Sequence, residues 1–222
     1  TVTADERAEI ITFAVKTAAG RVPVVIGTGS NSTAHTIEMS RQAEALGADG
    51  VLVVAPYYNK PTQEGHYQHF KATAAAIKIP LIVYNVPGRT GTNILPETVQ
   101  RLSRILNIAG IKEAAGDMAQ IDMLVRLIKK DRPDFAILSG NDDQAFHLVN
   151  SGGDGVISVL SNVMPRETSD MIRLALSGEV EKARELHHRM FPLMKNLFVE
   201  ANPIPVKYAV NRLGLCSNEL RL

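Results

Sequence analysis

Short apolar runs rich in β-branched residues alternate with amphipathic stretches along this chain. The apolar runs occupy residues 22–26, 51–54, 81–84, 107–112, 135–138 and 155–159. Near-continuous apolar runs of this length are typical of strands that are buried on both faces of a parallel sheet. The alternation therefore predicts an α/β fold built from strand–helix units.

The amphipathic stretches between the runs predict helices. They cover residues 33–46, 62–77, 96–102, 118–129, 142–150 and 165–176. An earlier helix is predicted by Thr3 and Glu6, which have the spacing of a capping box, and Pro96 suits a first helical position. Residues 179–200 and 205–213 are helical in pattern without intervening strands, so we expect a barrel-like domain over 1–176 and a C-terminal helical appendage over 177–222.

Six strand–helix units fit either a doubly wound sheet or part of an eight-stranded barrel. A doubly wound nucleotide-binding protein should offer a glycine-rich phosphate turn. Gly27-Thr28-Gly29 begins such a turn, but Ser32 takes the place of the third glycine, and no P-loop pattern occurs. The pattern therefore favours a (β/α)8 TIM barrel.

The net charge and the cysteine content indicate which binding partners and which cellular compartment to expect. The 24 basic and 23 acidic residues give a net charge of +1, so neither a nucleic-acid nor a membrane-surface partner is indicated. The single cysteine, Cys216, excludes a disulfide framework and favours a reducing cytoplasm. No apolar run approaches the length of about 20 residues that a membrane helix requires.

The histidines do not indicate a metal site. His66 and His69 are three residues apart in a predicted helix, but no acidic partner or cysteine pair completes a zinc pattern. His187 and His188 fall in the predicted appendage, where we expect a solvated helix face. Neither a metal nor an organic cofactor is expected.

Lys112 is the most informative residue at a predicted strand end. It closes an apolar run, so its amine should lie partly desolvated at the carboxyl end of the sheet, where functional groups gather. Desolvation disfavours the ammonium form, and a neutral amine can attack a carbonyl to form an imine. The alternative is a structural ion pair between Lys112 and Glu113.

Tyr84 and Arg89 follow the preceding strand. A phenol at Tyr84 could move protons to and from an imine, although a lone tyrosine there is more often part of the core. The turn over residues 87–91 would carry the Arg89 guanidinium, whose fork suits a carboxylate, although a loop arginine is usually only solvated. The aromatic loop over residues 56–61 is expected, from its residues alone, to pack against the protein or to form an interface.

Several segments together resemble a known family. Residues 84–91 and 110–114, with 56–61, 139–143, 155–158 and 202–207, match in order the motifs of the dihydrodipicolinate synthase family of pyruvate-dependent aldolases, which also includes N-acetylneuraminate lyase. The resemblance implies that Lys112 is the Schiff-base nucleophile for pyruvate. It also implies that Tyr84 donates and accepts protons and that Tyr58 extends this relay from a neighbouring subunit.

The resemblance further implies a second substrate. Arg89 would hold the carboxylate of aspartate semialdehyde, and the backbones near Gly140 and Ile157 would line the pocket. The product would be 4-hydroxy-tetrahydrodipicolinate, on the way to lysine, made by a homotetramer of two tight dimers. Arg89 favours this reaction over the alternative, another pyruvate-dependent aldolase acting on sialic acid or a sugar-derived oxo acid.

The chain departs from the family pattern at its beginning. Family members have two earlier strands, the second ending in a Gly-Thr-Thr-Gly-Glu turn, and this sequence starts after that turn. We therefore expect a TIM barrel that lacks its first two strands, with exposed strand edges. A polypeptide of only these residues would be poorly stable and little active, and an inactive fragment or binding module is the alternative from another functional class.

The resemblance also places an effector site. Lysine-inhibited members bind lysine through positions that match Ala4, Arg7, Asn31, His35 and Tyr57. Asn31 and Tyr57 fit that pattern, whereas Ala4, Arg7 and His35 replace two histidines and a glutamate. We expect weak or absent inhibition by lysine.

Overall fold

The structure is a computed structural model that describes residues 2–221. Its elements are α1 (Ala4–Ala18), β1 (Val25–Gly27), α2 (Thr33–Ala45), β2 (Gly50–Val54), α3 (Gln63–Ala75), β3 (Leu81–Asn85), α4 (Pro87–Thr90), α5 (Pro96–Ser103), β4 (Ile108–Glu113), α6 (Met118–Ile128), β5 (Ala136–Ser139), α7 (Asp142–Asn150), β6 (Gly155–Val156), η1 (Leu160–Asn162), α8 (Pro165–Leu176), α9 (Val180–Asn196) and α10 (Ile204–Arg212).

The described residues form two compact units, one from Val2 to Ile137 and the other from Leu138 onward. Strand order follows chain order from β1 to β6, and the strand pairs are parallel where their register is defined. This arrangement confirms the predicted α/β fold with a parallel sheet. The predicted boundary after residue 176 stays a prediction.

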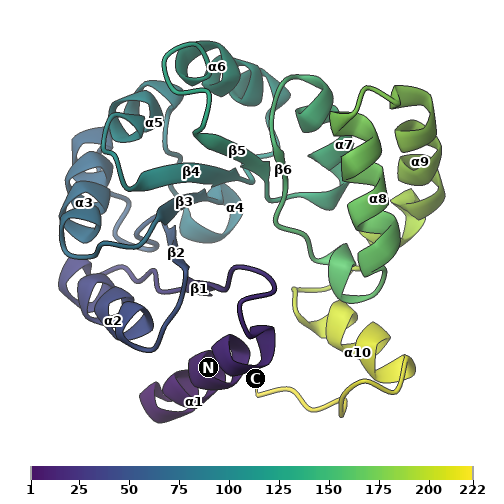
Figure 1. Ribbon diagram of the computed structural model, residues 1–222, viewed down its shortest axis with the longest axis horizontal. Helices are drawn as coiled ribbons and strands as arrows, with labels where there is room; N and C mark the ends of the chain where they lie inside the picture. Colours follow the sequence, from purple (N-terminus) through teal and green to yellow (C-terminus); the bar gives the residue numbers. More distant parts are fainter. Residues whose placement is uncertain (1, 222) are drawn as a thin grey trace. The chain divides into compact units, whose positions relative to one another are not determined.

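In the first unit, helices α2, α3, α5 and α6 lie along one side of strands β1 to β4 (Figure 1). Every second side chain of a strand points toward these helices, and on that face Val51, Val53 and Val83 are fully buried. The opposite face carries Ile82 and Tyr84, which are only half-buried. The face that the helices cover is therefore the more deeply buried of the two faces in this unit.

Local signals account for where several elements begin. The Thr3 hydroxyl accepts a hydrogen bond from the Glu6 amide at 3.2 Å, and the Glu6 carboxylate accepts one from the Thr3 amide at 2.8 Å. This reciprocal pair is the predicted capping box at the start of α1. Pro96 is the first residue of α5, as predicted, where its missing N–H removes no helical hydrogen bond.

Helix α9 corrects one expectation in the second unit. The predicted helices over 179–200 and 205–213 are present as α9 and α10. His188 is exposed, but His187 is only 2% exposed, so the solvated role expected for it is wrong. His187 lies on the same stripe of α9 as Ala183, Met190 and Met194, and their spacing turns the imidazole toward the core. Its ring stacks on that of Phe146, with centroids 5.3 Å apart.

Candidate active site

Lys112 and Tyr84 are direct neighbours on paired strands. They are register partners in β4 and β3, and the Lys112 Nζ atom lies 4.2 Å from the centroid of the Tyr84 ring. Both side chains are half-buried. Burial raises the pKa of the Tyr84 phenol, and the charge of Arg89 lowers it by less. The phenol is therefore protonated at neutral pH, beside the amine.

Arg89 lies in the one-turn helix α4, which follows β3 directly. Pro87 opens this turn, and Gly91 ends it with a φ of 72°, a left-handed conformation that glycine adopts at little cost. The Arg89 side chain is exposed, and its charge acts on the Tyr84 phenol. The structure thus brings Arg89 to the same strand ends as Tyr84 and Lys112.

Tyr57 and Tyr58 lie in the loop after β2. The Tyr58 amide donates to the Thr90 carbonyl at 3.3 Å, so this loop contacts the turn that carries Arg89. Tyr58 has a φ of 69° and is 87% exposed, and Tyr57 is 41% exposed. The Tyr58 ring is therefore available to another molecule, while its role in a relay between subunits stays a prediction.

The predicted effector residues lie near this same loop. The Asn31 carbonyl accepts a hydrogen bond from the side-chain amide of Asn59 at 2.8 Å, which joins it to the loop of Tyr57. His35 lies on the exposed surface of α2, where its Nδ1 atom is 3.3 Å from the Glu38 carboxylate. An effector role for Asn31, His35 and Tyr57 stays a prediction.

Gly140 and Ile157 belong to the second unit. Gly140 follows β5 directly, and Ile157 follows β6. The Ile157 amide donates to the Ser139 carbonyl at 2.9 Å, so the two predicted pocket positions lie at neighbouring strand ends of that unit. Their contribution to a substrate pocket stays a prediction.

The alternative of a structural ion pair between Lys112 and Glu113 stays a prediction, and the described contacts of Glu113 are made with other groups. Glu113 is 1% exposed and lies on the helical side of the sheet, because successive strand residues point to opposite faces. Its carboxylate accepts hydrogen bonds from the side-chain amides of Asn85 and Gln120 and from the Ala115 backbone. The hydrogen bonds described for Glu113 thus come from two side-chain amides and a backbone N–H.

Sequence reasoning missed Asn93 and Gln120, which complete this group of polar side chains. The Asn93 amide donates to the Gln120 side chain at 2.8 Å, and Gln120 donates in turn to Glu113 at 2.9 Å. No motif joins these positions. The available signal was the strand period of two, which places Glu113 on the face opposite Lys112 and therefore requires buried donors for it.

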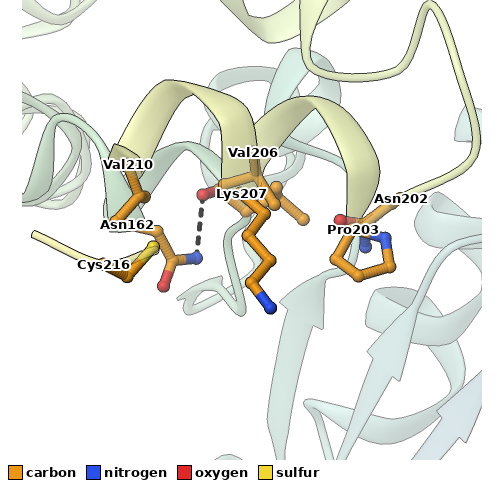
Figure 2. Close-up of a pocket in the computed structure, with 8 residues that line it drawn as sticks. Asn162, Asn202, Pro203, Val206, Lys207, Val210 and Cys216 are labelled. Atoms are coloured by element: carbon orange, nitrogen blue, oxygen red, sulfur yellow. Dashed lines mark hydrogen bonds between the residues drawn. The ribbon is translucent and has the colours of Figure 1, made fainter. Parts of the chain in front are cut away.

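A separate hollow lies in the second unit, beside η1 and α10 (Figure 2). Its volume is about 330 Å³, and its apolar wall includes Val159, Val206 and Val210. Lys207 extends into the same region, and the Asn162 side chain donates to the Val159 carbonyl at 3.0 Å. None of the residues predicted to carry the chemistry lines this hollow.

The described residues offer neither a cluster of metal ligands nor a membrane-spanning helix. Within residues 2–221, no set of three or more histidine, cysteine, aspartate or glutamate side chains is arranged to hold a metal ion. No helix in that part of the chain combines the length and apolar character needed to cross a bilayer.

Comparison with known proteins gives a consistent answer over the whole chain. The model of the dihydrodipicolinate synthetase family matches residues 1–222. The chain is 66% identical to the 4-hydroxy-tetrahydrodipicolinate synthase of Kosmotoga olearia, over all of this chain and 76% of that protein. A crystal structure of dihydrodipicolinate synthase from Thermotoga maritima superposes with a TM-score of 0.98 at 53% identity, again over all of this chain and 76% of the other.

A third relative has been solved with a ligand. The chloride-inhibited dihydrodipicolinate synthase from Acinetobacter baumannii, complexed with pyruvate, has a TM-score of 0.96 at 43% identity, over all of this chain and 75% of that one. Family model, sequence and structure agree, so the predicted family is confirmed: the chain belongs to the dihydrodipicolinate synthetase family.

Proposed function

We propose that this chain condenses pyruvate with aspartate semialdehyde to form 4-hydroxy-tetrahydrodipicolinate through a Schiff base on Lys112. One observation carries the proposal: the Lys112 amine lies 4.2 Å from the centre of the Tyr84 ring, at the ends of paired parallel strands. The family membership and the name of the Kosmotoga relative support the same reaction.

The reaction begins with attack of the neutral Lys112 amine on the ketone carbon of pyruvate. The tetrahedral carbinolamine that forms loses its hydroxyl as water once a proton reaches that oxygen, and a carbon–nitrogen double bond remains. Tyr84 is suited to supply this proton, because burial keeps its phenol protonated at neutral pH. Loss of a methyl proton then converts the imine to an enamine, and the carbon of the enamine attacks the aldehyde, whose oxygen takes up a proton. The imine re-forms in this step, and addition of the semialdehyde amino group to the imine carbon closes the ring and releases the Lys112 amine.

Arg89 is suited to the second substrate. Its guanidinium is exposed at the strand ends and presents donors in a fork that matches a carboxylate. In this proposal it holds the carboxylate of aspartate semialdehyde while the aldehyde carbon faces the enamine. Gly140 and Ile157 would line the pocket, and Tyr58 of another subunit would pass protons to Tyr84.

The assembly and the closed fold are part of the same proposal. The family membership supports a sheet that belongs to an eight-stranded barrel, a homotetramer of two dimers and a cytoplasmic location. The exposed Tyr58 ring supports a subunit contact at the loop after β2.

Borohydride trapping with pyruvate, followed by peptide mass spectrometry, tests the chemistry. The expected result is a reduced pyruvate adduct on Lys112 that disappears in Lys112→Ala and persists in Lys71→Ala, a matched lysine change on the exposed side of α3. An adduct that survives in Lys112→Ala, or no adduct in the folded chain, would refute the imine. Assays of two reactions then separate the two aldolases: condensation of pyruvate with aspartate semialdehyde, and cleavage of sialic acid.

A further inference from the structure

Four polar side chains form a buried network on the helical side of β3 and β4. Its members, which we call the amide–carboxylate network, are Asn85, Asn93, Glu113 and Gln120. Asn85 is 0% exposed, Glu113 1% and Gln120 8%. Polar groups this deep destabilise a fold unless their hydrogen bonds are made, so their arrangement calls for an explanation.

The donors of the network converge on one carboxylate. The Asn85 amide lies 3.1 and 3.0 Å from the two oxygens of Glu113, the Gln120 amide lies 2.9 Å from Oε2, and the Ala115 backbone N–H lies 2.6 Å from Oε1. Burial raises the pKa of Glu113 above its usual value, and these donors offset only part of that rise. Each of these groups donates to a carboxylate oxygen, so the Glu113 oxygens, as acceptors, fix which way each amide must point.

The network stands directly behind the residues that carry the chemistry. Asn85 follows Tyr84 in β3, Glu113 follows Lys112 in β4, and the two strands pair Asn85 with Glu113 as they pair Tyr84 with Lys112. The Asn85 carbonyl also accepts from the Ala114 amide at 2.9 Å. Any shift of one strand end against the other would therefore break buried hydrogen bonds to Glu113.

The network also closes the loop that carries Arg89. The Asn85 side chain accepts from the Ile94 amide at 3.0 Å and donates to the Asn93 side chain at 2.7 Å. These two bonds join the residue before the loop to the residues at its end. Through Asn85 and Gln120, which both contact Asn93, the base of the loop is tied to Glu113 and hence to β4.

We propose that Glu113 is a positioning residue that holds Tyr84 and the Arg89 loop in register against Lys112. It touches neither substrate, because it lies on the opposite face of the sheet from Lys112. The inference rests on the proposed function, because Glu113 would act on imine formation at Lys112 and on the binding of the aspartate semialdehyde carboxylate by Arg89.

Glu113→Gln is the informative change. It keeps the size of the side chain, but its new N–H₂ group faces the amide donors of Asn85 and Gln120, and at least one hydrogen bond is lost. We expect the rate of imine trapping with pyruvate to fall between about 10- and 100-fold, the effect of a misplacement of about 1 Å. The KM for aspartate semialdehyde should rise as well.

A charge exchange tests whether the hydrogen-bond network, rather than a carboxylate at position 113 itself, sets the rate of imine formation. In the double variant Glu113→Gln and Gln120→Glu, the hydrogen bond between the two side chains is restored with donor and acceptor reversed, and the carboxylate stays within the network. We expect this variant to recover most of the imine rate. Leu124→Ala is the structural control, because Leu124 is fully buried on α6 and takes no part in the network.

The outcomes are distinct. Leu124→Ala should lower the melting temperature without a matching loss of imine rate, whereas Glu113→Gln should lose imine rate beyond its effect on melting. An unchanged rate in Glu113→Gln, an equal loss in the control, or no recovery in the exchanged pair overturns the positioning role. Absence of an adduct in the unmodified chain refutes the proposed function itself, and the inference with it.

Discussion

Replacement of His69 should make the protein less sensitive to acid. His69 lies on α3, is 4% exposed, and its Nδ1 atom is hydrogen-bonded to the Thr33 hydroxyl at 2.9 Å. Its Nε2 atom is buried without a hydrogen-bond partner among the described residues. Burial, with repulsion from His66 as the second cause, lowers the pKa of His69 from 6.5 to about 4.

The direction and size of the effect follow from this shift. As pH falls below 6.5, His69 binds a proton in the unfolded chain, whereas in the folded chain it binds one only near pH 4. The folded state therefore loses stability across this window. For one proton, the loss between pH 7 and pH 4.5 is about 2.5 kcal/mol in the free energy of unfolding. Well above pH 6.5 neither state binds this proton, and the residue then contributes no pH dependence.

His69→Asn removes this titration while a side-chain oxygen or amide can still reach Thr33. Urea unfolding followed by circular dichroism at pH 7 and pH 4.5 should show an acid loss smaller by about 2.5 kcal/mol than in the parent protein. His35→Asn, the same substitution at an exposed histidine on α2, is the matched control. The reasoning fails if His69→Asn is as acid-sensitive as the parent, or if NMR shows the His69 ring titrating near pH 6.5.

Two more substitutions test the packing between strands and a buried hydrogen bond. Gly110→Ala would place a methyl group 2.5 Å from the Ala136 carbonyl oxygen, so it should lower the free energy of unfolding in urea by about 1–3 kcal/mol. A smaller loss would mean that the strands move apart at little cost. Asp142→Ala removes the oxygen that accepts hydrogen bonds from the Val159 and Leu160 amides at 3.0 and 2.9 Å, so it should lower the free energy of unfolding by about 2 kcal/mol or more. Asp142→Asn keeps a side-chain oxygen and should retain most of the stability. Equal losses in the two variants would contradict this role.

The strands were predictable because their residues carry the signal locally. The apolar run at 81–84 marks β3, and the run at 107–112 marks β4 to within one residue at each end. Because the strands are parallel, their order in the chain then placed Tyr84, Lys112 and Arg89 at one set of strand ends. Their side-by-side pairing follows from register, which the sequence alone does not specify.

The buried polar groups were not predictable in the same way. Asn93 and Gln120 lie 27 residues apart and meet only because α6 returns along the sheet. His187 has the composition of a solvated helix around it, and only the stripe formed with Ala183 and Met190 reveals that it faces inward. Such contacts depend on tertiary packing, which overrides the local preference of each residue.

Strand alternation makes the two faces of β4 inseparable. A slip of one residue against β3 would turn the Lys112 amine into the helical layer and bring the Glu113 carboxylate out in its place. The Lys112 amine would then lie among the helices, away from the substrate side, and the Glu113 carboxylate would lose the amide donors that bind it. Deletions or insertions within this strand should therefore abolish the chemistry even where a folded sheet survives, whereas the exposed loop around Tyr58 has no such constraint from the sheet.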